Sequence, residues 1–120
     1  MLIPEGQVRV WLYGQPTDMR KSFDGLSALV HTKLAEDPVS GQLFVFINRR
    51  RTQLKVLYFD RSGYCVWAKR LEQGRFHPPV GGRKQRLEWT EFKLILEGID
   101  LGSVRRYKRY RRPEIAEVPV

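Results

Sequence analysis

The side chains of this sequence that offer chemistry are mainly cations, and they gather in three short runs. The densest run covers residues 105–112, where six of eight residues are basic and none is acidic. Cations packed this closely neutralise phosphates and release counterions, and two tyrosines three positions apart can stack on exposed bases. The alternative is a solvated, solubilising tail. The candidate nucleic-acid contacts of this run are Arg105, Arg106, Tyr107, Lys108, Arg109, Tyr110, Arg111 and Arg112.

Two smaller basic runs lie earlier, at residues 49–51 and 83–86. Three arginines at the tip of a β-ribbon can reach a groove or a phosphate backbone. Taken alone, the first run is better explained as a charged turn that stays in water. Three runs together favour an extended basic surface, although the sequence leaves open whether they share one face. The candidate contacts in these two runs are Arg49, Arg50, Arg51, Arg83, Lys84 and Arg86.

The acidic residues suggest one alternative function, a metal-dependent nuclease. Its metal ligands would be Asp18, Asp24, Asp60 and Glu72. No spacing among them is typical of a metal site, and Asp18 and Asp60 are more simply a helix cap and a turn residue. The two histidines and one cysteine cannot build a four-ligand zinc site of the usual kinds. The sequence therefore predicts no catalytic residue, no metal and no cofactor.

Composition sets the class of protein in which these residues act. The chain has 120 residues, a net charge of +9 and 42% hydrophobic residues, which predicts one domain over residues 1–104 and a basic segment with a tail over 105–120. Such a charge favours a polyanionic partner such as DNA over a small-molecule substrate. A single cysteine, no signal peptide and no long apolar stretch predict a cytoplasmic protein without a membrane partner.

Apolar periodicity predicts the elements in the first half of the chain. Alternation over residues 7–13 indicates a strand. Apolar residues at three- and four-residue steps then predict a helix from Asp18 to Leu34, capped by Thr17 or Asp18. Its apolar stripe comprises Met19, Phe23, Leu26, Leu29, Val30 and Leu34.

The second half reads as an antiparallel meander followed by a short helix. Residues 43–48 are apolar on both faces and predict a central strand, with further strands at 53–60 and 64–71. Gly63 suits the left-handed position of the hairpin turn between them. A short strand at 86–89 precedes a helix capped by Thr90 and ended by Gly98. The predicted fold is α+β, with four or five antiparallel strands packed by one main helix and a short second helix.

Two segments of the sequence resemble a known family. Residues 16–26 read Pro-Thr-Asp-Met-Arg-Lys-Ser-Phe-Asp-Gly-Leu, and a second block runs from Leu43-Phe44-Val45-Phe46 to Gly74-Arg75-Phe76. Both resemble TnpB, the accessory-protein family encoded by the second open reading frame of IS66-like insertion elements. The resemblance implies a role in transposition beside a separate transposase that holds the catalytic machinery. The residues matching the opening motif, with roles left open, are Asp18, Arg20, Lys21 and Asp24.

Three hypotheses follow from these observations. The first is a non-enzymatic accessory protein in transposition that binds DNA, the transposase or both. The second is a subunit that docks on the transposase without touching DNA, through exposed aromatic side chains such as Trp11, Tyr13 or Trp67. The third is the metal-dependent nuclease.

Overall fold

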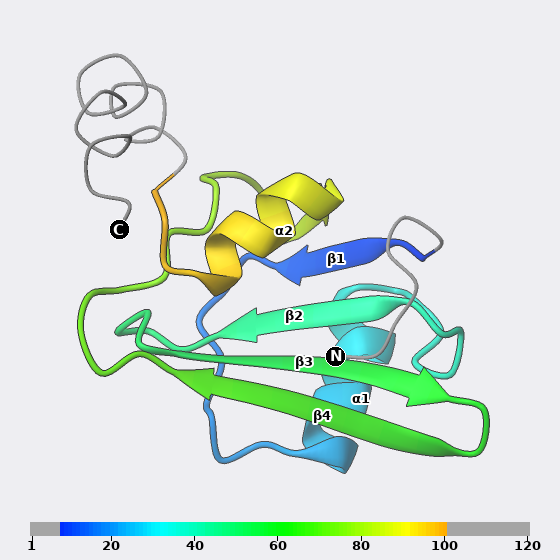
Figure 1. The fold of residues 1–120 in the computed structure, drawn as a ribbon. Coiled ribbons are helices and arrows are strands. Elements are labelled where there is room, and N and C mark those ends of the chain that lie inside the picture. The colour runs from blue at the N-terminus through cyan, green and yellow to red at the C-terminus, as the bar shows by residue number, and fades with distance from the viewer. Residues whose placement is uncertain (1–7, 101–120) are drawn as a thin grey trace, which may run out of the picture.

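A five-stranded sheet lies between two helices in the computed structural model, which describes residues 8–100 (Figure 1). Helix α1 covers the face at the back of the view and α2 the face at the front. The α+β prediction is therefore confirmed. The elements are β1 (Val10–Tyr13), α1 (Phe23–Lys33), β2 (Leu43–Ile47), β3 (Gln53–Asp60), β4 (Gly63–Arg70), β5 (Lys84–Leu87) and α2 (Trp89–Leu96).

The strand order is β4-β3-β2-β1-β5. The antiparallel meander β2-β3-β4 is as predicted, and β5 also pairs antiparallel with β1. The pairing of β1 with β2 is parallel, because the chain crosses the sheet through α1 between these two strands. The carboxyl ends of β1 and β2 therefore meet at the same end of the sheet, at the left of Figure 1.

Strand β2 lies in the middle of the sheet and is fully buried, which confirms the predicted central strand. Its side chains alternate between the two layers. Leu43, Val45 and Ile47 pack in the cluster that contains the α2 residues Phe92 and Ile95. Phe44 and Phe46 pack in the other cluster, with Leu26, Val30 and Leu34 of the α1 layer. Two cores, one on each face, hold the sheet in place.

Helix α1 begins later than predicted. Its N-cap is Ser22, and neither Thr17 nor Asp18 caps it. The cause is a contact with β3: the Lys55 ammonium donates to the backbone carbonyls of Met19 and Lys21, at 2.8 Å each. These carbonyls belong to a turn that enters the helix. Phe23 is 46% exposed, so the buried stripe begins only at Leu26.

The capping prediction for α2 is also wrong, because Thr90 lies inside the helix. Glu88 is the N-cap, and its N–H donates to the Glu91 carboxylate at 2.9 Å. This bond is one half of a capping box, in which the Glu88 side chain takes the N-cap place that the sequence assigned to the Thr90 hydroxyl. Gly98 adopts φ +72 at the C-terminal end, as predicted. Strand β5 ends at Leu87, two residues before the predicted end.

The hairpin between β3 and β4 has its left-handed residue at Arg61, with φ +51, rather than at Gly63. The reason is the register: Gly63 pairs with Asp60, which leaves Arg61 and Ser62 as the two turn residues. No helix within residues 8–100 is both long enough and apolar enough to cross a membrane. The division into residues 1–104 and 105–120 stays a prediction, because residues 101–120 lie outside the described range.

A candidate nucleic-acid interface at one end of the sheet

Three connecting segments meet at the end of the sheet where β1, β2 and β4 finish. We call residues 14–20, 48–52 and 71–83 together the arginine end. Backbone hydrogen bonds join its segments: the N–H of Gly14 donates to the Arg83 carbonyl at 2.8 Å, and that of Phe76 to the Arg51 carbonyl at 2.7 Å. The N–H of Thr17 donates to the Ile47 carbonyl at 2.9 Å. Arg83 and the run over residues 49–51 therefore lie at the same end of the sheet.

The turn over residues 48–52 is held rigidly by the Asn48 side chain. Its Oδ1 accepts from the N–H groups of Thr52 and Gln53 at 2.9 and 3.0 Å, and its Nδ2 donates to the Thr52 hydroxyl at 3.2 Å. The Arg51 N–H closes the turn on the Asn48 carbonyl at 3.0 Å. This network fixes the backbone from which three consecutive arginines project.

The guanidinium groups of Arg49, Arg50 and Arg51 are exposed. None of them forms a hydrogen bond or ion pair with a side chain or carbonyl within residues 8–100. Arg51 has φ +60, a left-handed conformation in which an arginine costs about 1 kcal/mol more than a glycine. The surrounding hydrogen bonds hold Arg51 in this conformation.

The run over residues 83–86 is divided between two surfaces. Arg83 is exposed beside Gly14 at the arginine end. Lys84 instead donates to the Glu36 carboxylate at 2.5 Å and lies over the Trp11 ring, 4.6 Å from its centroid. Arg86 is exposed opposite Trp11 on the edge strand β5. The structure therefore places Arg83 with residues 49–51, and commits Lys84 to an internal ion pair.

The contact with Lys84 also affects the ionisation of its partner, the Glu36 carboxylate. The hydrogen bond from Lys84, with a second from Gln42 at 3.1 Å, keeps the pKa of Glu36 below its ordinary value. Because residues 36 and 84 lie on segments far apart in the sequence, this pair links the loop after α1 to the edge strand.

Three of the motif residues that match the family pattern, Asp18, Arg20 and Lys21, lie in the turn before α1, and the fourth, Asp24, lies in the helix. The Arg20 guanidinium donates to both Asp18 oxygens, at 2.6–3.1 Å, and the Arg20 N–H donates to Asp18 Oδ1 at 2.9 Å. These bonds, with the Arg20 side chain as the larger cause, lower the pKa of Asp18 to about 2. Lys21 and Asp24 are exposed, with Asp24 in the first turn of α1.

Two functional supports escaped the sequence reasoning, Asn48 and Lys55. Asn48 closes the predicted strand over residues 43–48, and the signal for its role is that an asparagine side chain readily hydrogen-bonds to the backbone of a turn. Lys55 stands at an inward-facing position of a strand between the buried residues Leu54 and Val56. No signal in the sequence marks this lysine, because a polar residue is expected at that step of the alternation, and its acceptors are carbonyls of the distant motif turn.

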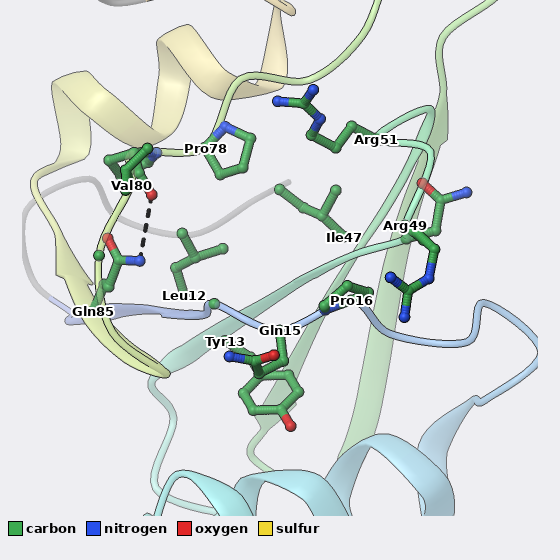
Figure 2. A pocket seen from close by; sticks show the side chains of 14 residues that line it. Leu12, Tyr13, Gln15, Pro16, Ile47, Arg49, Arg51, Pro78, Val80 and Gln85 are labelled. Atoms are coloured by element: carbon green, nitrogen blue, oxygen red, sulfur yellow. Dashed lines mark hydrogen bonds between the residues drawn. The ribbon is translucent and has the colours of Figure 1, made fainter.

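Two hollows flank Arg49. The smaller, of about 280 Å³, lies between residues 14–16, residues 48, 49 and 51, and residues 78–81 (Figure 2). The larger and more open one, of about 750 Å³, is lined by residues 16–20, 48–50, 52 and 53, including Asp18, Arg20 and Arg50. Arg49 lines both hollows and forms the ridge between them. The arginine end thus offers cations around concave surfaces rather than on a flat one.

The carboxylates proposed for a nuclease are spread over the molecule. Asp60 ends β3 at the opposite end of the sheet from Asp18 and Glu72. Within residues 8–100 there is no group of three or more His, Cys, Asp or Glu side chains that could hold a metal ion. The described residues therefore offer no geometry from which a metal-dependent step could be derived.

The three aromatic side chains suggested for protein contact differ in their exposure and in their internal hydrogen bonds. Tyr13 is buried at 9% exposure, so it cannot form an exposed contact. The Trp11 indole N–H donates to the Gln42 side chain at 2.7 Å, beneath Lys84. Trp67 is half-buried on the edge strand β4 and packs against the α2-side core. Of the three, Trp67 is the one that keeps exposed ring surface without an internal hydrogen bond.

The C-terminal basic segment, Arg105–Arg112, lies outside the described residues. Its candidate contacts therefore stay predictions.

Comparison with known proteins gives a family and two uncharacterised relatives. The family described as IS66 Orf2 like protein matches residues 8–106. The uncharacterized protein y4jC of Sinorhizobium fredii is 38% identical over 114 residues, covering 94% of this chain and 97% of that protein. The uncharacterized protein y4hO of the same organism is 40% identical over 101 residues, covering 82% and 88%. No solved structure matches the chain.

Proposed function

This chain belongs to the IS66 Orf2-like family, which supports an accessory role in transposition, and we propose that it is a non-enzymatic accessory protein that binds DNA through its arginine end. The two blocks that carry the resemblance in the sequence, residues 16–26 and 43–76, both lie within the family match over residues 8–106. Neither the family description nor the two relatives names a binding partner. The DNA-binding proposal therefore depends on the physical chemistry of the site.

The observation that carries the proposal is the fixed turn of residues 48–52. Three arginines without internal partners project from a backbone that Asn48 and the 71–76 segment hold in place. Over the whole arginine end, six residues are basic and two are acidic, Asp18 and Glu72. Each of these acids is already in an ion pair, with Arg20 at 2.6 Å and with Arg70 at 2.9 Å. Anions are thus favoured at this end.

The test is a titration of the full chain against labelled duplex DNA at several salt concentrations. One duplex carries an end of the element and the other has an unrelated sequence of equal length. We expect binding to both at low salt, with log affinity falling linearly with log salt, since each neutralised phosphate contributes about −0.9 to the slope. Tighter binding to the element end would add sequence recognition. Absence of binding to either duplex at low salt would remove the proposal.

A second candidate function is docking on the transposase, and one observation favours it. Strand β4 is an edge strand whose outer ladder has no partner within residues 8–100, and Trp67 on it is half-exposed. An edge strand and a large aromatic ring together suit a protein contact. Co-purification with the transposase that survives nuclease and high salt, and that Trp67→Ala weakens, would support this function. Loss of the complex on nuclease treatment alone would instead assign the contact to DNA.

A further inference from the structure

The smaller hollow at the arginine end contains apolar side chains, which phosphate binding alone does not require. Leu12 and Ile47 close its floor from neighbouring strands, nearly buried at 1% and 5% exposure, and the accessible apolar surface comes from Pro78 and Val80 above them (Figure 2). Arg49 and Arg51 stand at its mouth on the side of the 48–52 turn. An apolar floor below two cations suits a ligand that is flat and apolar in one part and anionic in another.

The wall of the hollow formed by residues 78–83 is tied to the strands beside it. The backbones of Gly14 and Gly82 approach so closely that a Cβ on Gly14 would collide with the Gly82 carbonyl. The Gln85 amide nitrogen donates to the carbonyls of Pro79 and Gly82 at 3.3 and 3.1 Å. The close approach at Gly14 and the hydrogen bonds of the Gln85 amide hold the wall in place, and the hollow is therefore preformed.

The polar groups of the hollow are few and differ in their availability. The Gln15 side chain lines the wall and makes no hydrogen bond within residues 8–100. Gln85 uses its amide nitrogen on the wall, which leaves its oxygen as an acceptor. Val80 is fully exposed at the rim. A nucleobase matches this set, because it stacks on aliphatic and guanidinium surfaces and pairs its edge with amides.

The size of the hollow limits the ligand further. At about 280 Å³ it lies just under the ~300–1,000 Å³ of sites for drug-sized ligands, which suits a single ring system. In a fully paired duplex the faces of the bases are covered by their neighbours. A base can enter such a hollow only from a single strand or after leaving the stack.

We infer that this hollow accepts the base of one unpaired nucleotide while Arg49 and Arg51 hold the flanking phosphates, an inference that rests on the proposed binding of DNA. Arg49 also lines the larger hollow together with Arg50, so the adjoining strand continues across the Arg49 ridge. The protein then prefers DNA with an unpaired or displaced nucleotide over a perfect duplex. This preference goes beyond attraction to phosphate, which does not distinguish the two.

The experiment compares three ligands of one sequence: a perfect duplex, the same duplex with one unpaired 2-aminopurine, and the single strand containing that base. We expect the unpaired ligands to bind about 10-fold more tightly than the duplex. We also expect the 2-aminopurine fluorescence to change on binding, because the base enters a new environment. Equal affinities with unchanged fluorescence would overturn the inference while leaving the proposed function intact. Absence of binding to all three ligands would instead remove the proposed function.

Two substitutions locate the effect at the hollow. Val80→Glu places a carboxylate at the rim, and Val39→Glu makes the same change at the opposite end of the sheet, where Val39 is 48% exposed. Because both side chains are exposed, both variants should fold. We expect Val80→Glu to abolish the preference for the unpaired ligand, measured as a ratio of affinities, and Val39→Glu to retain it. An unchanged ratio in Val80→Glu would overturn the inference.

Discussion

Two hairpin turns sit at opposite ends of β3, and each places an arginine in the left-handed region. Arg51 has φ +60 in the turn of residues 48–52, and Arg61 has φ +51 in the turn of residues 60–63. The first turn is fixed by the Asn48 side chain and by backbone bonds from residues 71 and 76. The second is closed by its strand ladder and a contact from the Ser62 N–H to the Asp60 carbonyl. The same backbone conformation thus occurs in two different surroundings.

The two turns also differ in the charge of the residues around them. Residues 34–42 and 60–63, at the far end of the sheet, hold three acidic residues and one basic one, Arg61. The arginine end holds six basic and two acidic residues. A strained arginine alone is therefore a weak signal of function, since the molecule contains one at each end. Immobilisation and neighbouring cations distinguish the turn of residues 48–52.

The largest expected difference comes from removing the three arginines of that turn. In Arg49→Ala/Arg50→Ala/Arg51→Ala, loss of up to three phosphate contacts should reduce the magnitude of the log–log salt slope on duplex DNA by about 2.7. At about 0.1 M salt this corresponds to a loss of affinity on the order of 10²-fold. Anisotropy titrations at several salt concentrations measure both quantities.

The matched control removes cations away from the arginine end. Arg9 and Arg61 are both exposed, and neither lies in an ion pair within residues 8–100. Arg9→Ala/Arg61→Ala should leave the salt slope nearly unchanged. If the magnitude of the salt slope fell equally per arginine in both variants, DNA would be attracted by the whole surface. The proposed difference between the two ends would then be wrong.

The next prediction tests whether the Asn48 side chain fixes the turn of residues 48–52. Asn48→Ala removes three side-chain hydrogen bonds, and at roughly 0.5–1.5 kcal/mol each, reduced by solvent at a half-buried site, the expected loss in free energy of unfolding is about 2 kcal/mol. Urea unfolding measures it. Asn48→Asp keeps the acceptor for two of the three bonds and should lose less. A neutral Asn48→Ala would show that the strand ladder alone holds the turn.

A smaller effect is expected from removing the backbone strain. Arg51→Gly and Arg61→Gly should each raise the free energy of unfolding by about 0.5–1 kcal/mol, since glycine adopts positive φ without a steric penalty. Only Arg51→Gly should also weaken DNA binding, by roughly 5–10-fold at about 0.1 M salt for one lost phosphate contact. Thermal unfolding and anisotropy on the same preparations test both expectations. Equal weakening in the two variants would contradict the assignment of binding to the arginine end.

Local patterns predicted much of this molecule, and contacts between distant residues account for what they missed. The buried stripe Leu26, Val30 and Leu34 follows from spacing alone, as does the two-faced strand β2. The start of α1 does not, because Lys55 withdraws two carbonyls from across the sheet. The parallel pairing of β1 with β2 was also missed, since the topology of the crossover decides it.

The candidate site shows the same division. The position of the turn at Arg49–Arg51 was predicted from its polar sequence, and the structure adds what holds it. The internal pairing of Lys84 with Glu36 could not be predicted, because 48 positions separate the two residues. A basic run in a sequence does not indicate which of its cations remain free, and only the packing of the sheet separates Arg83 from Lys84.

The smallest expected effect concerns the two carboxylate–cation pairs, one near each end. Asp18 pairs with Arg20, two residues away, and both are largely exposed, whereas Glu36 and Lys84 join distant segments. The pKa of Asp18 is lowered to about 2 from 3.8, so its contribution to stability is complete above pH 3.8 and is lost as the pH falls towards 2. In Arg20→Gln the pKa should rise towards 3.8 but stay below it, because the backbone N–H of residue 20 still donates. Carboxyl chemical shifts followed by NMR give the midpoint.

The free energy of unfolding at pH 7 should hardly change in Arg20→Gln, since an exposed local pair contributes little. Lys84→Gln should lower it measurably, because the substitution releases the loop after α1 from β5. If Arg20→Gln proved the more destabilising, the motif pair would be a structural anchor of the arginine end rather than a local turn contact.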